Sequence, residues 1–182
     1  LFTYNAFCVI SDMLHTKVGT ITANESRFVE WKSVDGSYEA TQYADWKTPL
    51  DGIFPKERLV SILKNFILFS EDAKILAGYH QFFAVSKALE RVHDAIGGDG
   101  KGGVFWHTQG SGKSLSMVFL AHLLEEKLDS PTIVVITDRN DLDSQLFAQF
   151  SRCSDFLRQT PVQAQSRSDL AQQLSSRRAN GI

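Results

Sequence analysis

Two segments of the chain, residues 56–70 and 80–96, place an apolar side chain at every third or fourth position. This spacing puts the apolar side chains on one face of an α-helix. The apolar positions are Leu59, Ile62, Leu63, Phe66 and Ile67 in the first segment, and Phe82, Val85, Leu89, Val92 and Ile96 in the second. We therefore predict two helices that face the core, the second ending in the glycine-rich loop 97–103.

Other segments have the composition of β-strands. Residues 6–11 and 18–22 are rich in β-branched and aromatic residues and predict a strand pair near the start of the chain. Residues 24–31 follow, and we predict a short helix there with Asn24 as its N-cap. Residues 131–137 form a continuous apolar run bounded by turn signals, which is typical of a parallel strand buried on both faces.

The second half of the chain alternates predicted strands and helices. An apolar run from Val104, a helix over 113–128 and the strand at 131–137 predict a βαβ unit, in which parallel strands need a right-handed crossover. A helix over 138–150 should face inward with Leu142, Leu146 and Phe150. A short strand at Val162 and a helix over 166–178, ended by Asn180-Gly181, complete the prediction of an α/β fold with a parallel sheet.

Between the first strand and the helix of this unit lies the sequence V-F-W-H-T-Q-G-S-G-K-S, residues 104–114. Gly110 and Gly112 allow a left-handed backbone whose N–H groups surround an anion. Lys113 would contact the β- and γ-phosphates of a nucleotide, and the Ser114 hydroxyl would bind the accompanying Mg²⁺. The segment therefore predicts a phosphate-binding loop, although the first glycine of the G-x-x-x-x-G-K-[ST] pattern is replaced by His107. The alternative is a glycine-rich turn with an exposed lysine.

Gln81 lies near the start of the helix that precedes this loop. Its side-chain amide offers one donor and one acceptor, the pair that can bind the edge of an adenine. A surface role is the alternative, and the position ahead of a phosphate-binding loop favours nucleotide contact.

Composition narrows the class of protein only slightly. The chain has 182 residues, of which 43% are hydrophobic, and a formal net charge of −2. A nearly neutral chain does not indicate nucleic-acid binding, but a local basic groove would be enough for it. Cys8 and Cys153 match no metal or redox spacing, so we expect two free thiols in a reducing cytoplasm. The longest apolar runs, 66–69 and 133–136, are far shorter than the roughly 20 residues that span a bilayer.

Several strings together resemble one family. They are Y-H-Q-F-F-A-V from Tyr79, G-G-V-F-W-H-T-Q-G-S-G-K-S from Gly102, P-T-I-V-V-I-T-D-R-N-D-L-D-S-Q-L-F from Pro131 and Q-T-P-V-Q-A from Gln159. The chain is similar, over nearly its whole length, to the restriction (R) subunit of type I restriction-modification enzymes. In that family a superfamily 2 helicase-like DNA translocase is fused to a nuclease, and a histidine is expected at position 107.

The resemblance implies a set of site residues. Gln81 matches the glutamine that contacts adenine, and Thr108, Gln109, Gly110, Ser111, Gly112, Lys113 and Ser114 match the first helicase motif. Lys113 would be the catalytic lysine, and Ser114 would bind Mg²⁺ with ATP. Asp138-Arg139, Leu142 and Gln145 match the next motif, which runs along the DNA backbone. Arg139 and Gln145 are therefore the candidate DNA contacts, Arg139 through a guanidinium that binds phosphate oxygens.

The resemblance also implies a domain organisation and partners. Residues 1–50 should be the C-terminal part of a nuclease domain, 51–78 a linking helix region, and 79–182 the first part of a RecA-like motor lobe. The family's D-E-x-H box would follow Ile182 and its nuclease residues would precede Leu1, so we expect the piece alone to be inactive. The implied cofactors are ATP and Mg²⁺. The implied partners are double-stranded DNA and the methylation (M) and specificity (S) subunits, with no membrane, in the cytoplasm of a bacterial or archaeal cell.

Two other functions fit parts of the sequence. One is another superfamily 2 DNA translocase, such as a type III restriction subunit, which would share the phosphate loop but not H-T-Q-G-S-G-K-S together with T-D-R-N-D-L. The other is a non-catalytic nucleotide-binding or protein-interaction module. A purely structural loop has no need of Lys113 and Ser114, which weighs against that reading.

Overall fold

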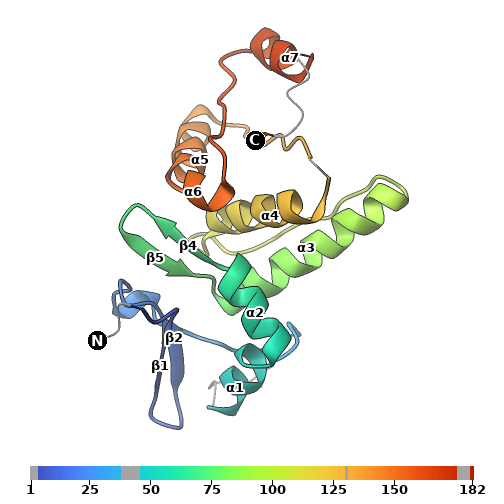
Figure 1. Ribbon diagram of the computed structural model, residues 1–182. Coiled ribbons are helices and arrows are strands. Elements are labelled where there is room, and N and C mark those ends of the chain that lie inside the picture. Colours follow the sequence, from blue (N-terminus) through green and yellow to red (C-terminus); the bar gives the residue numbers. More distant parts are fainter. Residues whose placement is uncertain (1–3, 38–45, 130, 176–180) are drawn as a thin grey trace.

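The computed structural model describes residues 4–37, 46–129, 131–175 and 181–182 (Figure 1). The chain begins with a three-stranded antiparallel sheet of order β1-β2-β3. Its strands are β1 (Cys8–Ser11), β2 (Thr16–Gly19) and β3 (Val29–Glu30). The register runs from Cys8 opposite Gly19 to Ser11 opposite Thr16, which confirms the predicted strand pair. The second strand begins two residues earlier than the composition indicated.

The predicted helix over residues 24–31 is wrong. Only the single 3₁₀ turn η1 (Glu25–Arg27) forms there, and Asn24 makes no side-chain cap to it. Its carboxamide oxygen accepts a hydrogen bond from the Ser26 hydroxyl instead, at 2.8 Å. Val29 then pairs with Val18 in the sheet, so strand pairing overrides the local helix signal.

The next elements are the short helix α1 (Lys47–Ile53), the helix α2 (Lys56–Asn65) and the hairpin of β4 (Ile67–Ser70) and β5 (Ala73–Leu76). The helix predicted over residues 56–70 therefore ends five residues early. The carbonyl of Phe66 accepts a hydrogen bond from the Ala77 N–H at 2.9 Å, and Ile67 pairs with Leu76. The apolar run that continued the helical pattern thus becomes a strand, because its backbone finds a partner strand after a tight turn.

Two long helices form the centre of the molecule. The predicted helix over residues 80–96 is confirmed as α3 (Tyr79–Gly97), and the helix after the phosphate-binding segment is α4 (Lys113–Lys127). The two helices pack against each other (Figure 1). Phe66 from the end of α2 packs between them, with ring centroids 4.7 Å from Phe82 and 5.6 Å from Phe119. The N-terminus of α4 is thereby fixed relative to that of α3.

The C-terminal part contains α5 (Asn140–Arg152), α6 (Ser154–Leu157) and α7 (Arg167–Ser175). Phe150 faces inward as predicted and is 3% exposed, whereas Leu142 is 40% exposed, so its predicted inward position is wrong. The short helix α6 was not predicted. The predicted helix over 166–178 is described from Arg167 to Ser175, and Asn180 lies outside the described residues.

The prediction of a parallel sheet is wrong for the described part of the chain. The segments 104–106 and 133–137 are extended but form no strand, and both described sheets are antiparallel. Thr132 makes an isolated parallel bridge to Gly181, and no strand begins at Val162, although its N–H donates to the Ile182 carbonyl at 2.8 Å. A strand forms only where its backbone pairs with a neighbouring strand, and an apolar strand of a parallel sheet is covered on both faces. No described strand flanks either segment, and Ile136 is 82% exposed.

One apolar core connects the three predicted regions, 1–50, 51–78 and 79–182. Its buried members include Trp31 from the first, Phe66 and Leu68 from the second, and Val118 and Phe119 from the third. The domain boundaries at 50 and 78 stay predictions.

Within the described ranges, no helix is long and apolar enough to cross a membrane.

Candidate nucleotide-binding site

The phosphate loop, residues 107–114, connects the extended segment after α3 to the first turn of α4. Gly110 has φ +81° and Gly112 has φ +80°, so both occupy the left-handed region that glycine favours. Gly112 is the N-cap of α4. The first N–H groups of a helix have no acceptor within the helix, and its dipole is positive at that end. The loop therefore has the backbone conformation and the polarity of an anion site.

Lys113 is the first residue of α4, and its side chain folds back over the loop. Its Nζ donates to the carbonyl of His107 at 3.0 Å and to the carbonyl of Thr108 at 2.8 Å. The ammonium group is therefore held beside the loop backbone, and an incoming phosphate would meet it there. Thr108, Gln109 and Ser114 are exposed, with Ser114 in the first turn of α4.

Gln81 connects α3 to the phosphate loop. Its Oε1 accepts the Gly78 N–H at 2.9 Å, and its Nε2 donates to the Gly112 carbonyl at 3.0 Å. The side chain is 6% exposed. Both ends of the amide are thus engaged within the protein in this structure, so an adenine contact would require part of this arrangement to open.

The neighbouring residue, His80, also contacts the loop. Its Nε2 lies 3.1 Å from the Ser111 carbonyl, and its ring centroid lies 5.2 Å from that of His107. Sequence reasoning missed this contact. The signal that could have found it is the position of His80 directly beside Gln81, in the first turn of the same helix.

Electrostatics favour a neutral His107 at the loop. Its pKa is lowered, first by burial and then by the nearby His80 and the Lys113 ammonium. The Lys113 ammonium is then the main positive charge on the loop at neutral pH.

The described residues fit a bound nucleoside triphosphate. Buried polar atoms normally have hydrogen-bond partners, but the Ser111 Oγ and the His107 Nδ1 are buried and have none within the described structure. A Cβ built on Gly110 would have no described atom within 4 Å, so the space beside the loop is open. For Mg²⁺ the candidate ligand is the hydroxyl of Ser114, an exposed residue in the first turn of α4. The described ranges contain no cluster of three His, Cys, Asp or Glu side chains suited to a metal ion.

The two candidate DNA contacts lie away from the loop, around the start of α5. Arg139 is the N-cap residue of α5, and Gln145 is exposed on the same helix. The Arg139 guanidinium is bound to Asp141 by two hydrogen bonds, Nη2 to Oδ2 at 2.6 Å and Nε to Oδ1 at 3.2 Å. The structure therefore brings Gln81 and the loop residues together, and it places Arg139 and Gln145 on a different helix, α5.

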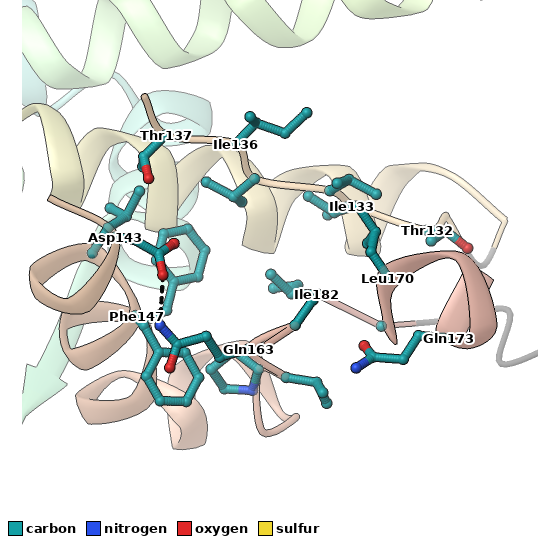
Figure 2. A pocket seen from close by; sticks show the side chains of 18 of the residues that line it. Thr132, Ile133, Ile136, Thr137, Asp143, Phe147, Gln163, Leu170, Gln173 and Ile182 are labelled. Carbon is teal, nitrogen blue, oxygen red and sulfur yellow. Dashed lines mark hydrogen bonds between the residues drawn. The ribbon is translucent and has the colours of Figure 1, made fainter. Parts of the chain in front are cut away.

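A cavity of about 750 Å³ lies beside α5 and separate from the phosphate loop, which contributes no residue to its lining. The extended segment 132–137, α5 and α7 all contribute side chains to it (Figure 2). Figure 2 shows Gln163 pointing to Asp143 of α5, and its Nε2 donates to Oδ2 at 2.6 Å. The walls are largely apolar, because the segment that lacks strand partners lines one side.

The part of the chain that contains this site matches a family of known proteins. Residues 80–182, which contain Gln81, the phosphate loop and α5, match the SWI2/SNF2 ATPase family, and the chain belongs to this family. The match covers more than half of the chain and begins in the first turn of α3.

Two similar proteins carry the names of restriction-enzyme subunits. The chain is 41% identical, over its full length, to the type I restriction enzyme HindI endonuclease subunit of Haemophilus influenzae, of which it spans 18%. It is 35% identical, over 83% of its length, to a putative type I restriction enzyme MjaIXP endonuclease subunit of Methanocaldococcus jannaschii, of which it spans 17%. The chain thus covers less than a fifth of each relative. The resemblance to type I restriction endonuclease subunits is confirmed.

Proposed function

We propose that the chain is part of the motor and endonuclease subunit of a type I restriction enzyme, and that it binds ATP through the phosphate loop. The intact subunit would use ATP hydrolysis to translocate double-stranded DNA and would then cleave unmodified foreign DNA. It would act in a complex with methylation and specificity subunits.

The observation that carries the proposal is the geometry of the loop at the start of α4. Two glycines with positive φ, the N-terminus of a helix and a lysine held over the loop form an anion site of the kind that binds nucleotide phosphates. The SWI2/SNF2 ATPase match over residues 80–182 supports ATP as the ligand.

Four loop residues and Gln81 have roles in this proposal. The N–H groups around Gly110 and Gly112 would bind phosphate oxygens, and the Lys113 ammonium would exchange its two carbonyl acceptors for the β- and γ-phosphates. Ser114 would hold the Mg²⁺ that comes with ATP, which supplies charge neutralisation at the phosphates. Gln81 would contact the adenine once its bonds to Gly78 and Gly112 rearrange.

The first test is a titration of the chain with a fluorescent ATP analogue and Mg²⁺. Saturable binding by the wild type and its loss in Lys113→Ala would support the proposal. Lys101→Ala is the matched control, because Lys101 is an exposed lysine in the glycine-rich segment just before the loop. Equal binding by Lys113→Ala and the wild type would contradict the nucleotide site.

The second test addresses the motor and nuclease. The intact subunit, assembled with its methylation and specificity subunits, should hydrolyse ATP faster when unmethylated double-stranded DNA is added and should cleave that DNA. Lys113→Ala should abolish both activities. An ATPase rate that DNA does not change would exclude the translocase.

A further inference from the structure

His80 and Gln81, two successive residues in the first turn of α3, bind the carbonyls of two successive residues of the phosphate loop. His80 Nε2 lies 3.1 Å from the Ser111 oxygen, and Gln81 Nε2 lies 3.0 Å from the Gly112 oxygen. A carbonyl oxygen can only accept a hydrogen bond, so the His80 Nε2 must carry the proton. The histidine is thereby fixed as a donor to the loop.

Packing holds the His80 ring in the position from which it donates. The ring meets Tyr79 edge-on, with centroids 5.5 Å apart at 82°, and lies 5.2 Å from the His107 ring. A Cβ built on Gly78 would lie 2.8 Å from the His80 Cε1 and 3.1 Å from its Nδ1. Gly78 is therefore the residue whose missing side chain leaves room for the ring.

Because the peptide bond is planar, this contact also sets the direction of an N–H group on the other side of the loop. In a trans peptide the C=O and the following N–H point in opposite directions. The Ser111 carbonyl and the Gly112 N–H belong to one peptide plane, so a bond from His80 to that carbonyl turns the Gly112 N–H away from α3. The bond from Gln81 to the Gly112 carbonyl orients the Lys113 N–H in the same manner.

We propose that His80 is a positioning residue of the nucleotide site: it holds the Ser111–Gly112 peptide plane so that the Gly112 N–H is available to a phosphate oxygen. This inference rests on the proposed function. Both hydrogen bonds form without a ligand, so His80 and Gln81 orient the loop before the nucleotide binds.

Two substitutions separate the hydrogen bond from the packing of the ring. His80→Phe keeps an aromatic ring against Tyr79 and His107 but removes the donor, whereas His80→Gln removes the ring and keeps a side-chain N–H. We expect His80→Phe to bind the fluorescent ATP analogue with Mg²⁺ about tenfold more weakly than the wild type. His80→Gln should stay within about threefold of the wild type, since its donor has similar reach. A role in packing alone would give the opposite order.

The same titration distinguishes failure of this inference from failure of the nucleotide site. If the wild type binds and Lys113→Ala does not, the nucleotide site stands, and equal affinities for His80→Phe and the wild type would then overturn the role of His80 alone. If the wild type and Lys113→Ala behave alike, the nucleotide site itself is overturned.

A measurement on the unsubstituted chain keeps the inference testable if His80→Phe does not fold. Nitrogen-15 NMR of the histidine side chains at pH 7.5 should show His80 with its proton on Nε2, and its signal should move when the Mg²⁺ complex of the ATP analogue binds. A proton on Nδ1 with a bare Nε2 would exclude the hydrogen bond to Ser111 and overturn the proposal.

Discussion

Gln81 occupies the space that a side chain at Gly112 would need. A Cβ built on Gly112 would lie 2.7 Å from the Gln81 Nε2, the same nitrogen that donates to the Gly112 carbonyl at 3.0 Å. Gly112 therefore meets two demands at once, a left-handed backbone with φ +80° and close contact with Gln81. This relationship connects the phosphate loop to the start of α3 and makes Gly112 sensitive to any substitution.

Gly112→Ala should consequently weaken binding of the ATP analogue at least tenfold. The methyl group would displace the Gln81 amide and strain the backbone, at a cost of about 1–3 kcal/mol in stability. Gly100→Ala is the matched control, because Gly100 has φ +69° and no described atom lies within 4 Å of its built Cβ. That variant should lose about 1 kcal/mol of stability from the backbone alone and keep its affinity. Denaturant unfolding and the nucleotide titration measure the two effects, and equal affinities for both variants would refute the prediction.

Asp141 should limit the affinity of Arg139 for DNA. Both side chains are more than half exposed, and their carboxylate–guanidinium pair is of the weak surface kind. Arg139→Ala is expected to weaken binding to duplex DNA and to lower the slope of log affinity against log salt by about 1. Asp141→Asn, which frees the guanidinium, should strengthen binding about two- to fivefold.

The readout for these two variants is fluorescence anisotropy with labelled duplex DNA over a range of salt concentrations. Arg152→Ala serves as the control. Arg152 lies at the other end of α5 and pairs with Glu71. A slope that Arg152→Ala lowers as much as Arg139→Ala does would show a general charge effect and no specific contact.

The sequence predicted correctly those helices whose signals lie within the helix itself. The helix α3 and the start of α4 follow from apolar spacing and from the Gly112-Lys113 junction, and the structure has both. The helix at residues 24–31 and the extension of α2 to residue 70 were wrong, because β3 and β4 are stabilised by pairing with other strands. The apolar spacing within each segment does not show that Val29 pairs with Val18 or Ile67 with Leu76.

In the candidate site, too, the sequence predicted some residues, and other contacts depend on the packing of the helices. The sequence identified Gln81, Gly110, Gly112 and Lys113 from residue types and spacing, and the structure places these residues together. The contact between His80 and Ser111 spans 31 residues, so it depends on how α3 packs against α4. Segments 104–106 and 133–137 form no strands within the described residues for the same reason: an apolar run predicts a strand, but a strand forms only where another segment pairs with it.

Gly52→Ala should destabilise the fold by about 1–3 kcal/mol through overpacking. A Cβ there would lie 2.5 Å from the Trp31 Nε1 and 2.8 Å from the Ser33 carbonyl oxygen, and Trp31 is fully buried. Gly97→Ala is the matched control in α3, since its built Cβ meets no described atom within 4 Å. It should leave stability unchanged or raise it by about 0.5–1 kcal/mol, because alanine is the better helix former. Urea unfolding followed by circular dichroism compares the two, and a loss in Gly97→Ala as large as that in Gly52→Ala would contradict the steric explanation.

His122 should make the fold less stable in mild acid. Burial lowers its pKa most strongly; the positive charge of Arg158 lowers it further, and Glu126 and a hydrogen bond to the Phe156 backbone act in the opposite direction. A histidine whose pKa is lower in the folded state takes up more protons in the unfolded chain. Its contribution to stability is therefore complete above the pKa of the unfolded histidine and is lost as the pH falls through the folded pKa. His107, whose pKa is also lowered, adds a contribution of the same sign.

His122→Phe should reduce this acid sensitivity while keeping a ring against Phe156, whose centroid lies 4.1 Å from that of His122. We expect the difference in unfolding free energy between pH 8 and pH 5.5 to be smaller in His122→Phe than in the wild type. His93→Phe removes an exposed histidine from α3 and is the control. Urea unfolding at several pH values between 5.5 and 8 gives the comparison. If His93→Phe reduces the pH dependence as much as His122→Phe does, the burial of His122 is not its source.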